Sequence, residues 1–203
     1  MDFDLACCEF RKVTFSKGED IYLQHDNADC FYFIDNGLVA LNRLLLNGKE
    51  VLSRVYSCEQ YFGYRTLLSG QTYHVGAKAL TDVTLTKIHV VNLDAFFQNN
   101  INFVRFLMSE MATELRHAEI RLSKMPSHSV ELRVIDSMID LVKVDSTYNW
   151  TYREIASHCG CSTETVIRVS KKLKTSHLME GKNTQKSFDI EKLYHERMRL
   201  AML

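Results

Sequence analysis

The chain has 203 residues, 46% of them hydrophobic, and its 25 basic and 25 acidic side chains leave no formal net charge. This length and apolar content allow one large domain or two small ones. The sequence contains no run of about 18 uncharged apolar residues, which argues against a transmembrane helix, and its acidic start, "MDFDLACCEFRK", lacks the apolar core of a secretory signal. We therefore expect a cytoplasmic protein with no membrane partner, and six cysteines that are thiols rather than disulfides.

Residues from about 10 to 90 have the composition of short β-strands. Turn signals separate the extended segments, and Asn47-Gly48 between two of them is a strong hairpin signal. This pattern predicts a barrel, roll or sandwich. The four segments richest in aromatic and β-branched residues are Phe31–Ile34, Leu38–Leu44, Glu50–Tyr56 and Val83–Val90.

A long helix is predicted from Ile101. Apolar residues recur there at alternating steps of three and four, which is the a and d spacing of a coiled coil. The seam predicts a homodimer, and the alternative is an amphipathic helix packed on its own domain. Pro126 is expected to end the helix, because its ring and missing N–H prevent continuation. The predicted interface residues are Ile101, Val104, Met108, Met111, Leu115, Ala118, Leu122 and Met125.

The next helical pattern, Val130–Lys143, leads to two short helices that follow each other closely. Thr151 and Glu154 form a capping box that begins the first of these. Gly160 suits the left-handed residue that ends it, and Ser162 caps the second. Two short helices around a glycine turn predict a helix-turn-helix.

The second of these helices has an apolar face, formed by Val166, Val169 and Leu173, and a polar outer face. The segment 165–186 holds six Lys or Arg residues against one Glu, so this side can bind a polyanion. A small hairpin is predicted within Leu178–Ile190, and a final helix from Glu191.

Cys159 and Cys161 flank the predicted turn, where two interpretations compete. Small apolar residues usually fill the space between the two helices at such positions. A metal site would need two more ligands, and the only candidates, His158 and His177, have poor spacing. The sequence therefore favours structural thiols and no metal.

The stretch from Thr151 to Leu173, with Glu164, Thr165, Val166 and Arg168 in its second helix, closely resembles the helix-turn-helix of the Crp/Fnr family of bacterial transcription regulators. The resemblance extends over nearly the whole chain. It implies an α+β fold, and a homodimer that binds a palindromic operator in double-stranded DNA and contacts RNA polymerase. The implied domains are an N-terminal antiparallel, jelly-roll-like β-roll for effectors (1–93), a long dimerisation helix (94–125) and a C-terminal winged helix-turn-helix (126–203).

The helix at 162–174 would read the operator. Arg168 can donate two hydrogen bonds to guanine, and Glu164 can accept one from cytosine; four residues apart, they can also form an ion pair. Thr163 stands where members of the cyclic-AMP branch carry an arginine, which implies an Fnr-type half-site, roughly TTGAT, rather than TGTGA. Lysines would contact phosphates. The predicted DNA contacts are Thr151, Ser162, Thr163, Glu164, Thr165, Ile167, Arg168, Lys171, Lys172 and Lys182.

The segment Phe62–Leu80 corresponds to the phosphate cassette of the family's cyclic-nucleotide members. Tyr64 stands where those members have Glu, and Tyr73 and His74 stand where they have Arg and Ser. Loss of the arginine removes a bidentate contact, so no response to cyclic AMP is expected. An unidentified small-molecule effector remains open, with Gly63, Tyr64, Arg65, Tyr73 and His74 as its candidate residues.

No cofactor is predicted. Adjacent Cys7 and Cys8, with Cys30 far away in sequence, fit an iron–sulfur cluster poorly. A thiol switch at Cys7 and Cys8 is an alternative to ordinary reduced thiols. Haem is not expected, because the histidines that could bind it are better explained as ordinary surface or core residues. These histidines are His25, His74 and His89.

Two other functional classes compete with DNA binding. The first is a regulatory sensor or scaffold that acts on a protein partner, and the basic segment 165–186 argues against it. The second is an enzyme, and the sequence contains no recognisable catalytic motif that would support one.

Overall fold

The computed structural model describes residues 5–69, 72–175, 179–182 and 185–202, with 179–182 and 185–188 described by their backbone. The chain divides into two units, Met1–Lys49 with Ser53–Ile120, and Glu50–Leu52 with Arg121–Leu203. None of the helices in these ranges is long and apolar enough to cross a membrane.

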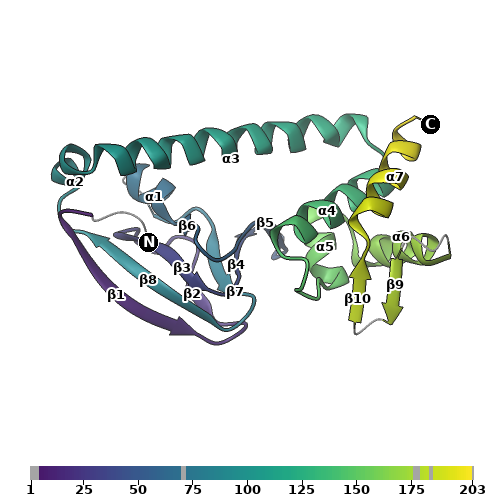
Figure 1. Ribbon diagram of the computed structural model, residues 1–203, viewed down its shortest axis with the longest axis horizontal. Coiled ribbons are helices and arrows are strands. Elements are labelled where there is room, and N and C mark those ends of the chain that lie inside the picture. Colours follow the sequence, from purple (N-terminus) through teal and green to yellow (C-terminus); the bar gives the residue numbers. More distant parts are fainter. Residues whose placement is uncertain (1–4, 70–71, 176–178, 183–184, 203) are drawn as a thin grey trace. The chain divides into compact units, whose positions relative to one another are not determined.

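Two four-stranded sheets form an antiparallel β-roll (Figure 1). In the first sheet β1 pairs with β8 in unbroken register, from Cys8 opposite Val90 to Phe15 opposite Val83. The strand order of this sheet is β1 (Cys8–Phe15), β8 (Val83–Val90), β3 (Cys30–Asn36) and β6 (Tyr61–Phe62). The order of the second sheet is β2 (Asp20–Tyr22), β7 (Gly76–Ala79), β4 (Val39–Leu44) and β5 (Glu50–Tyr56).

The predicted α+β class and β-roll are confirmed, and the four predicted strands correspond to β3, β4, β5 and β8. The short strands β2, β6 and β7 were not predicted individually. A helix, α1 (Tyr64–Ser69), lies inside the segment that was expected to be β. Its six residues are too few for a clear helical period in the sequence.

Strand β3 is buried on both faces, which explains its unbroken apolar sequence. Its side chains alternate between two hydrophobic clusters. Tyr32 and Ile34 point into the cluster between the sheets, with Phe62 and Leu85. The neighbours in sequence enter a second cluster that includes residues of α2 and α3; its aromatic members are Phe31, Phe33, Tyr61, Tyr64, Phe96 and Phe103.

The segment predicted as one dimerisation helix contains two helices, α2 (Leu93–Asn99) and α3 (Ile101–Ser127). Asn100 separates them: its backbone leaves the helical region, and its side-chain amide donates to the carbonyl oxygens of Phe96 and Ala6. The amide oxygen of Asn100 also accepts from the N–H of Ala6, 2.9 Å away, which fixes the start of the described chain.

The prediction that Pro126 ends the helix is wrong by one residue, because Pro126 lies inside the last turn of α3. The helical hydrogen bonding continues around it. His128 N–H donates to the carbonyl oxygen of Lys124 at 2.9 Å, and the Ser127 hydroxyl donates to that of Ser123. Proline removes one donor, and these neighbouring bonds hold the turn.

The second unit contains α4 (Val130–Val144), a helix pair and a hairpin. A buried carboxylate, Asp136 on α4, is its polar centre: Arg197 Nε lies 2.6 Å from Oδ1, and Lys124 Nζ lies 3.0 Å from Oδ2. Burial disfavours the charged carboxylate, but these cations outweigh it and hold the pKa of Asp136 below its ordinary value. The remaining elements are α5 (Tyr152–Cys159), α6 (Thr163–Thr175), β9 (Met179–Lys182), β10 (Gln185–Phe188) and α7 (Ile190–Ala201).

Candidate nucleic-acid interface

The start and the end of α5 have the predicted capping geometry. The Thr151 hydroxyl accepts from Glu154 N–H at 3.1 Å, and the Glu154 carboxylate accepts from Thr151 N–H at 2.7 Å, so the capping box is complete. Gly160 is left-handed, with φ of 73°, and its N–H donates to the Ala156 carbonyl oxygen. These two caps fix the length of α5 and the direction of the turn that follows.

The turn leads into α6, whose burial follows the predicted pattern. The Ser162 hydroxyl accepts from Thr165 N–H at 3.3 Å, which caps the helix. Val166, Val169 and Leu173 are buried, as are Ile155, Ala156 and Cys159 on α5. Thr165 and Ile167 are partly buried at the edge of this face. The packing leaves the opposite side of α6 toward solvent.

Glu164 and Arg168 are both exposed on the outer side of α6. Hydrogen bonds to Glu164 from its own backbone amide and from Ser162 hold the pKa of its carboxyl below the ordinary value, so it is ionised near neutral pH. Within the described ranges, Arg168 makes no hydrogen bond or ion pair, and the proposed pair with Glu164 is not formed. An unpaired guanidinium on an exposed helix face can recognise an anion or a guanine edge.

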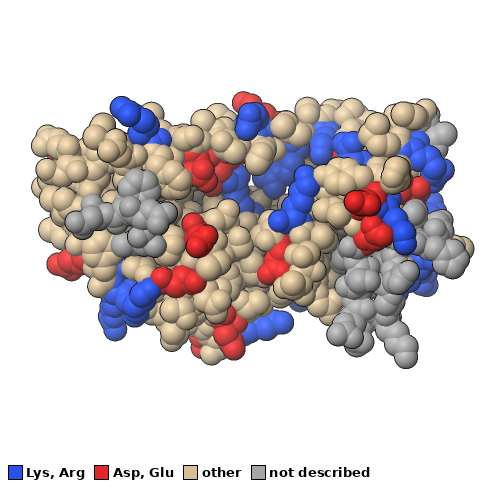
Figure 2. Space-filling view, in the orientation of Figure 1, with Lys and Arg blue, Asp and Glu red and all other residues tan. Residues whose placement is uncertain are grey.

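The predicted phosphate contacts have different surroundings. Lys171 is exposed, whereas Lys172 Nζ lies 2.9 Å from Glu131 of α4 and is already paired. The side chain of Lys182 lies outside the described residues. Arg153, exposed on the first turn of α5, is a further basic residue that the sequence reasoning missed. Figure 2 shows basic and acidic side chains interspersed over the described part of one face. This face of the protein is therefore not uniformly basic.

Cys159 is buried between the helices and is 5% exposed, whereas Cys161 is only partly buried. Burial, reinforced by Cys161, raises the pKa of Cys159 to about 12, which keeps it a neutral thiol. Across the described ranges, no group of three or more His, Cys, Asp and Glu side chains could hold a metal ion. His177 lies outside those ranges, so the absence of a metal stays a prediction.

We expect His158 to give the second unit a pH-dependent stability. Burial lowers its pKa to about 4, and the charge of Arg121 acts in the same direction. Because the ordinary value is 6.5, the unfolded chain binds more protons between pH 6.5 and 4, and stability falls as the pH falls through that window. We expect a loss of about 2 kcal/mol between pH 7 and pH 5.

The measurement is urea unfolding followed by Trp150 fluorescence. Trp150 is the only tryptophan of the chain and is buried in this unit. His158→Gln, which cannot titrate, is the control and should lose about 2 kcal/mol less than the wild type over the same interval. Equal losses in the two proteins would show that other groups cause the pH dependence.

The predicted coiled-coil seam contains two kinds of residue. The a positions Ile101, Met108, Leu115 and Leu122 are all more than half exposed. The d positions differ, because Val104 and Met111 pack against the apolar cluster of the first unit. Ala118 is partly buried, and the Met125 sulfur accepts from Arg133 at 2.7 Å. The described chain therefore exposes the four a positions and one d position, Met125, which is 51% exposed.

The candidate effector residues have separate partners. Tyr73 is buried between the sheets, with its ring 3.7 Å from that of Tyr22, and its hydroxyl donates to the Cys30 carbonyl oxygen. A Cβ at Gly63 would lie 3.6 Å from the Tyr73 ring. Tyr64 and Arg65 instead turn toward α3, and His74 contacts Thr66. Stacked aromatic rings thus fill the space beside the predicted cassette.

The residues proposed for redox or cofactor roles have ordinary surroundings where the structure describes them. Burial, with Cys7 as a smaller cause, raises the pKa of Cys8 to about 11, so little thiolate is present near neutral pH. Cys30 is buried among tyrosines, and burial raises the pKa of its thiol. The absence of cofactor and redox roles stays a prediction.

Comparison with known proteins gives consistent matches. Residues 12–100 match the cyclic nucleotide-binding domain family. An uncharacterized protein of Haemophilus influenzae is 38% identical over 109 residues, which are 54% of this chain and 84% of that protein. The cAMP-activated global transcriptional regulator CRP of Pasteurella multocida is 25% identical over 190 residues, which are 89% of this chain and 90% of that protein.

The solved structure of FixK2 from Bradyrhizobium japonicum has the same fold. Its TM-score is 0.78 at 22% identity, and the match covers 92% of this chain and 96% of that one. The match extends over most of the chain and supports the assignment of its fold.

Proposed function

The chain belongs to the Crp/Fnr family of bacterial transcription regulators, and from this membership we propose that it binds double-stranded DNA as a homodimer and reads a palindromic operator. The observation that carries the proposal is the outer face of α6. An exposed arginine without a described partner, Arg168, lies there one turn from the ionised Glu164. Together they offer donors for a guanine and an acceptor for a cytosine.

Dimerisation would place two such helices on successive major grooves of a palindrome. The exposed a positions of α3 supply the apolar surface for this pairing. Lys171 and Arg153 are candidates for phosphate contacts, which fix position without reading sequence. We further propose that the DNA-bound dimer contacts RNA polymerase and has no catalytic activity.

Selection of bound DNA from a random pool tests this function. We expect enrichment of a palindrome with a G·C pair in each half-site. The logarithm of the binding constant should fall linearly with the logarithm of the salt concentration. The slope should correspond to the several phosphates that a dimer contacts. A pool without enrichment, together with binding that does not depend on salt, would favour a scaffold that acts on a protein partner.

The protein should not respond to cyclic AMP. Tyr64 and Tyr73 occupy two cassette positions, and their hydroxyls are committed to Glu114 and to the Cys30 carbonyl oxygen. Calorimetric titration with cyclic AMP should show no micromolar site and no change in operator affinity. The cAMP-activated CRP of Pasteurella multocida is the positive control. A micromolar site that alters operator binding would contradict this prediction.

A further inference from the structure

Glu114 is a buried carboxylate in the middle of α3. Its side chain is 8% exposed, and its neighbours on the same side of the helix, Phe103 and Leu107, belong to the apolar cluster of the first unit. An ionised carboxylate in such a place is costly unless charged and hydrogen-bonding partners surround it.

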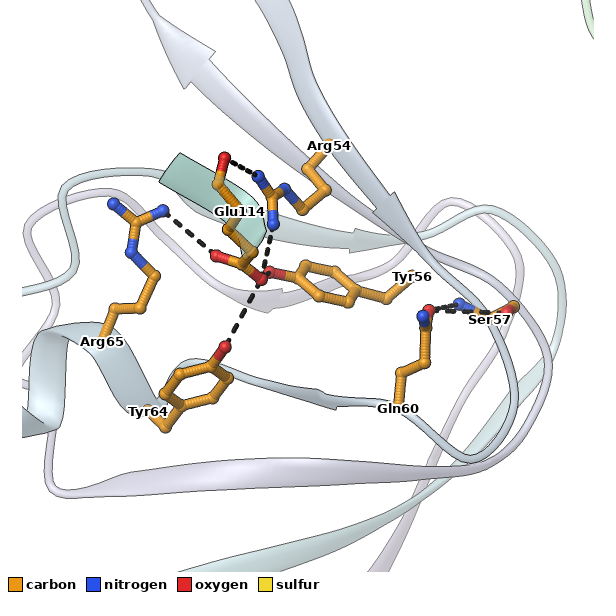
Figure 3. Close-up of polar contacts among 7 residues, drawn as sticks. All are labelled: Arg54, Tyr56, Ser57, Gln60, Tyr64, Arg65 and Glu114. Atoms are coloured by element: carbon orange, nitrogen blue, oxygen red, sulfur yellow. Dashed lines mark hydrogen bonds and ion pairs between the residues drawn. The ribbon is translucent and has the colours of Figure 1, made fainter. Parts of the chain in front are cut away.

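The partners of Glu114 come from the β-roll (Figure 3). Arg54 of β5 places Nη1 2.5 Å from Oε1, and the Tyr56 hydroxyl donates to the same oxygen at 2.7 Å. From α1, the Tyr64 hydroxyl donates to Oε1 at 3.4 Å, and Arg65 Nη1 lies 3.4 Å from Oε2. All four donors belong to the roll, and the acceptor belongs to α3.

The second guanidinium nitrogen of Arg54 also donates to the backbone carbonyl oxygen of Glu114, at 3.4 Å. Arg54 therefore binds both the side chain and the main chain of one residue of α3. Its guanidinium lies over the Tyr56 ring, 5.8 Å from the ring centre, in a cation–π contact. This packing orients Arg54 toward the helix.

The four donors carry an excess of positive charge. Two guanidinium groups face one carboxylate, and both phenols stay neutral, since burial and then the charge of Glu114 raise the pKa values of Tyr56 and Tyr64. Guanidinium and phenol groups that converge in this way form a donor set suited to a carboxylate or a phosphate. Arg65 is half exposed and forms the solvent-facing side of this donor set.

We propose that Arg54, Tyr56, Tyr64 and Arg65 form an anion site on the β-roll whose resident ligand is the Glu114 carboxylate of the same chain. The roll is thereby attached to α3 without a diffusible anionic effector at this place. A carboxylate held on a packed helix has an effective concentration far above that of a free metabolite. Small anions should therefore fail to displace it. The inference concerns the first unit alone and does not depend on DNA binding.

An ordinary buried ion pair and a ligand site differ in one measurable respect, which is rescue by a free anion. Glu114→Ala empties the site and leaves the two arginines unpaired, so we expect its melting temperature to fall by roughly 10 °C in sodium chloride. Sodium acetate at equal ionic strength should restore several degrees in a saturable way. The wild type should melt at the same temperature in sodium chloride and in sodium acetate of equal ionic strength.

The readout is near-ultraviolet circular dichroism of the buried tyrosines, because the only tryptophan lies in the other unit. Glu119→Ala, an exposed position on the same helix, is the matched control and should show no specific effect of acetate. Adding Arg65→Ala to Glu114→Ala should weaken the rescue. If Glu114→Ala folds poorly in chloride, refolding in acetate should recover it.

Three outcomes would overturn the proposal. Glu114→Ala could melt identically in acetate and chloride, or fail to fold in both salts. Alternatively, the wild type could itself be stabilised by millimolar acetate beyond the effect of chloride, which would mean that the site accepts diffusible anions in place of Glu114. Each result is independent of whether the protein binds an operator.

Discussion

Replacing Met108 and Leu115 together by lysine should convert the protein from dimers to monomers. Both side chains are more than 60% exposed in the single chain, so lysine there does not disturb the first unit. At about 2 kcal/mol for each apolar side chain that a dimer buries, four substitutions per dimer cost about 8 kcal/mol. The dissociation constant of the dimer should therefore rise about 10⁶-fold, and operator affinity should fall with it. Sedimentation velocity measures the first effect and gel shift the second.

The matched control is Asn102→Lys with Ser109→Lys. These exposed residues are also one heptad apart on α3, but they point away from the apolar row. This variant adds the same charge and should stay dimeric with unchanged operator affinity. A Met108→Lys/Leu115→Lys variant that still sediments as a dimer would show that the subunits associate through another surface.

The choice of residues for this test depends on the structure. In the sequence, all eight a and d positions appear equivalent, because periodicity shows which residues share a stripe but not what covers it. Met111, a d position, packs against the cluster of the first unit, so a charge there would damage that unit as well as an interface. The exposed a positions separate the two effects.

Features that depend on local sequence were predicted well. The capping box at Thr151, the left-handed Gly160 and the Ser162 cap each involve residues a few positions apart, and all three have the expected geometry. Strands β5 and β8 were predicted to the residue, since turns bound them and β-branched residues fill them. The helix α1 was missed, because its six residues are too few to show a helical period inside a segment expected to be β.

Features that depend on distant residues could not be predicted. Asp136 and Arg197 are 61 positions apart and form one ion pair, and nothing in either local sequence indicates the other. Glu114 occupies a g position of the heptad pattern, where a carboxylate normally lies in solvent. Its burial depends on the packing of α1 and β5 against α3, which only tertiary structure reveals.

The same distinction applies to the proposed reading of DNA. The sequence predicts which side of α6 faces outward, and the burial of Val166, Val169 and Leu173 agrees. The sequence left open whether Arg168 would form an ion pair with Glu164. In the described part of the chain the two are unpaired, so Arg168 needs no bond broken before it meets a base.

Arg168→Ala should therefore weaken operator binding by about 1–3 kcal/mol, or roughly 5- to 150-fold, and relax the preference at one G·C pair. Folding stability should not change, because the side chain is exposed and unpaired among the described residues. Fluorescence anisotropy on operators substituted at each base pair measures both affinity and preference. The half-site should be permissive where Thr163 replaces an arginine, because threonine is too short for a bidentate contact with guanine.

Lys171→Ala separates the effect of recognising a base from the effect of an electrostatic contact with phosphate. This lysine is exposed on the same helix, so its loss should weaken binding to all operators alike and reduce the salt slope by about one unit. Lys172→Ala should have a smaller effect, because Glu131 already neutralises that lysine. Were Arg168→Ala to weaken every substituted operator equally, as Lys171→Ala should, Arg168 would touch only phosphate. The specificity would then have to come from Glu164 or from the shape of the DNA.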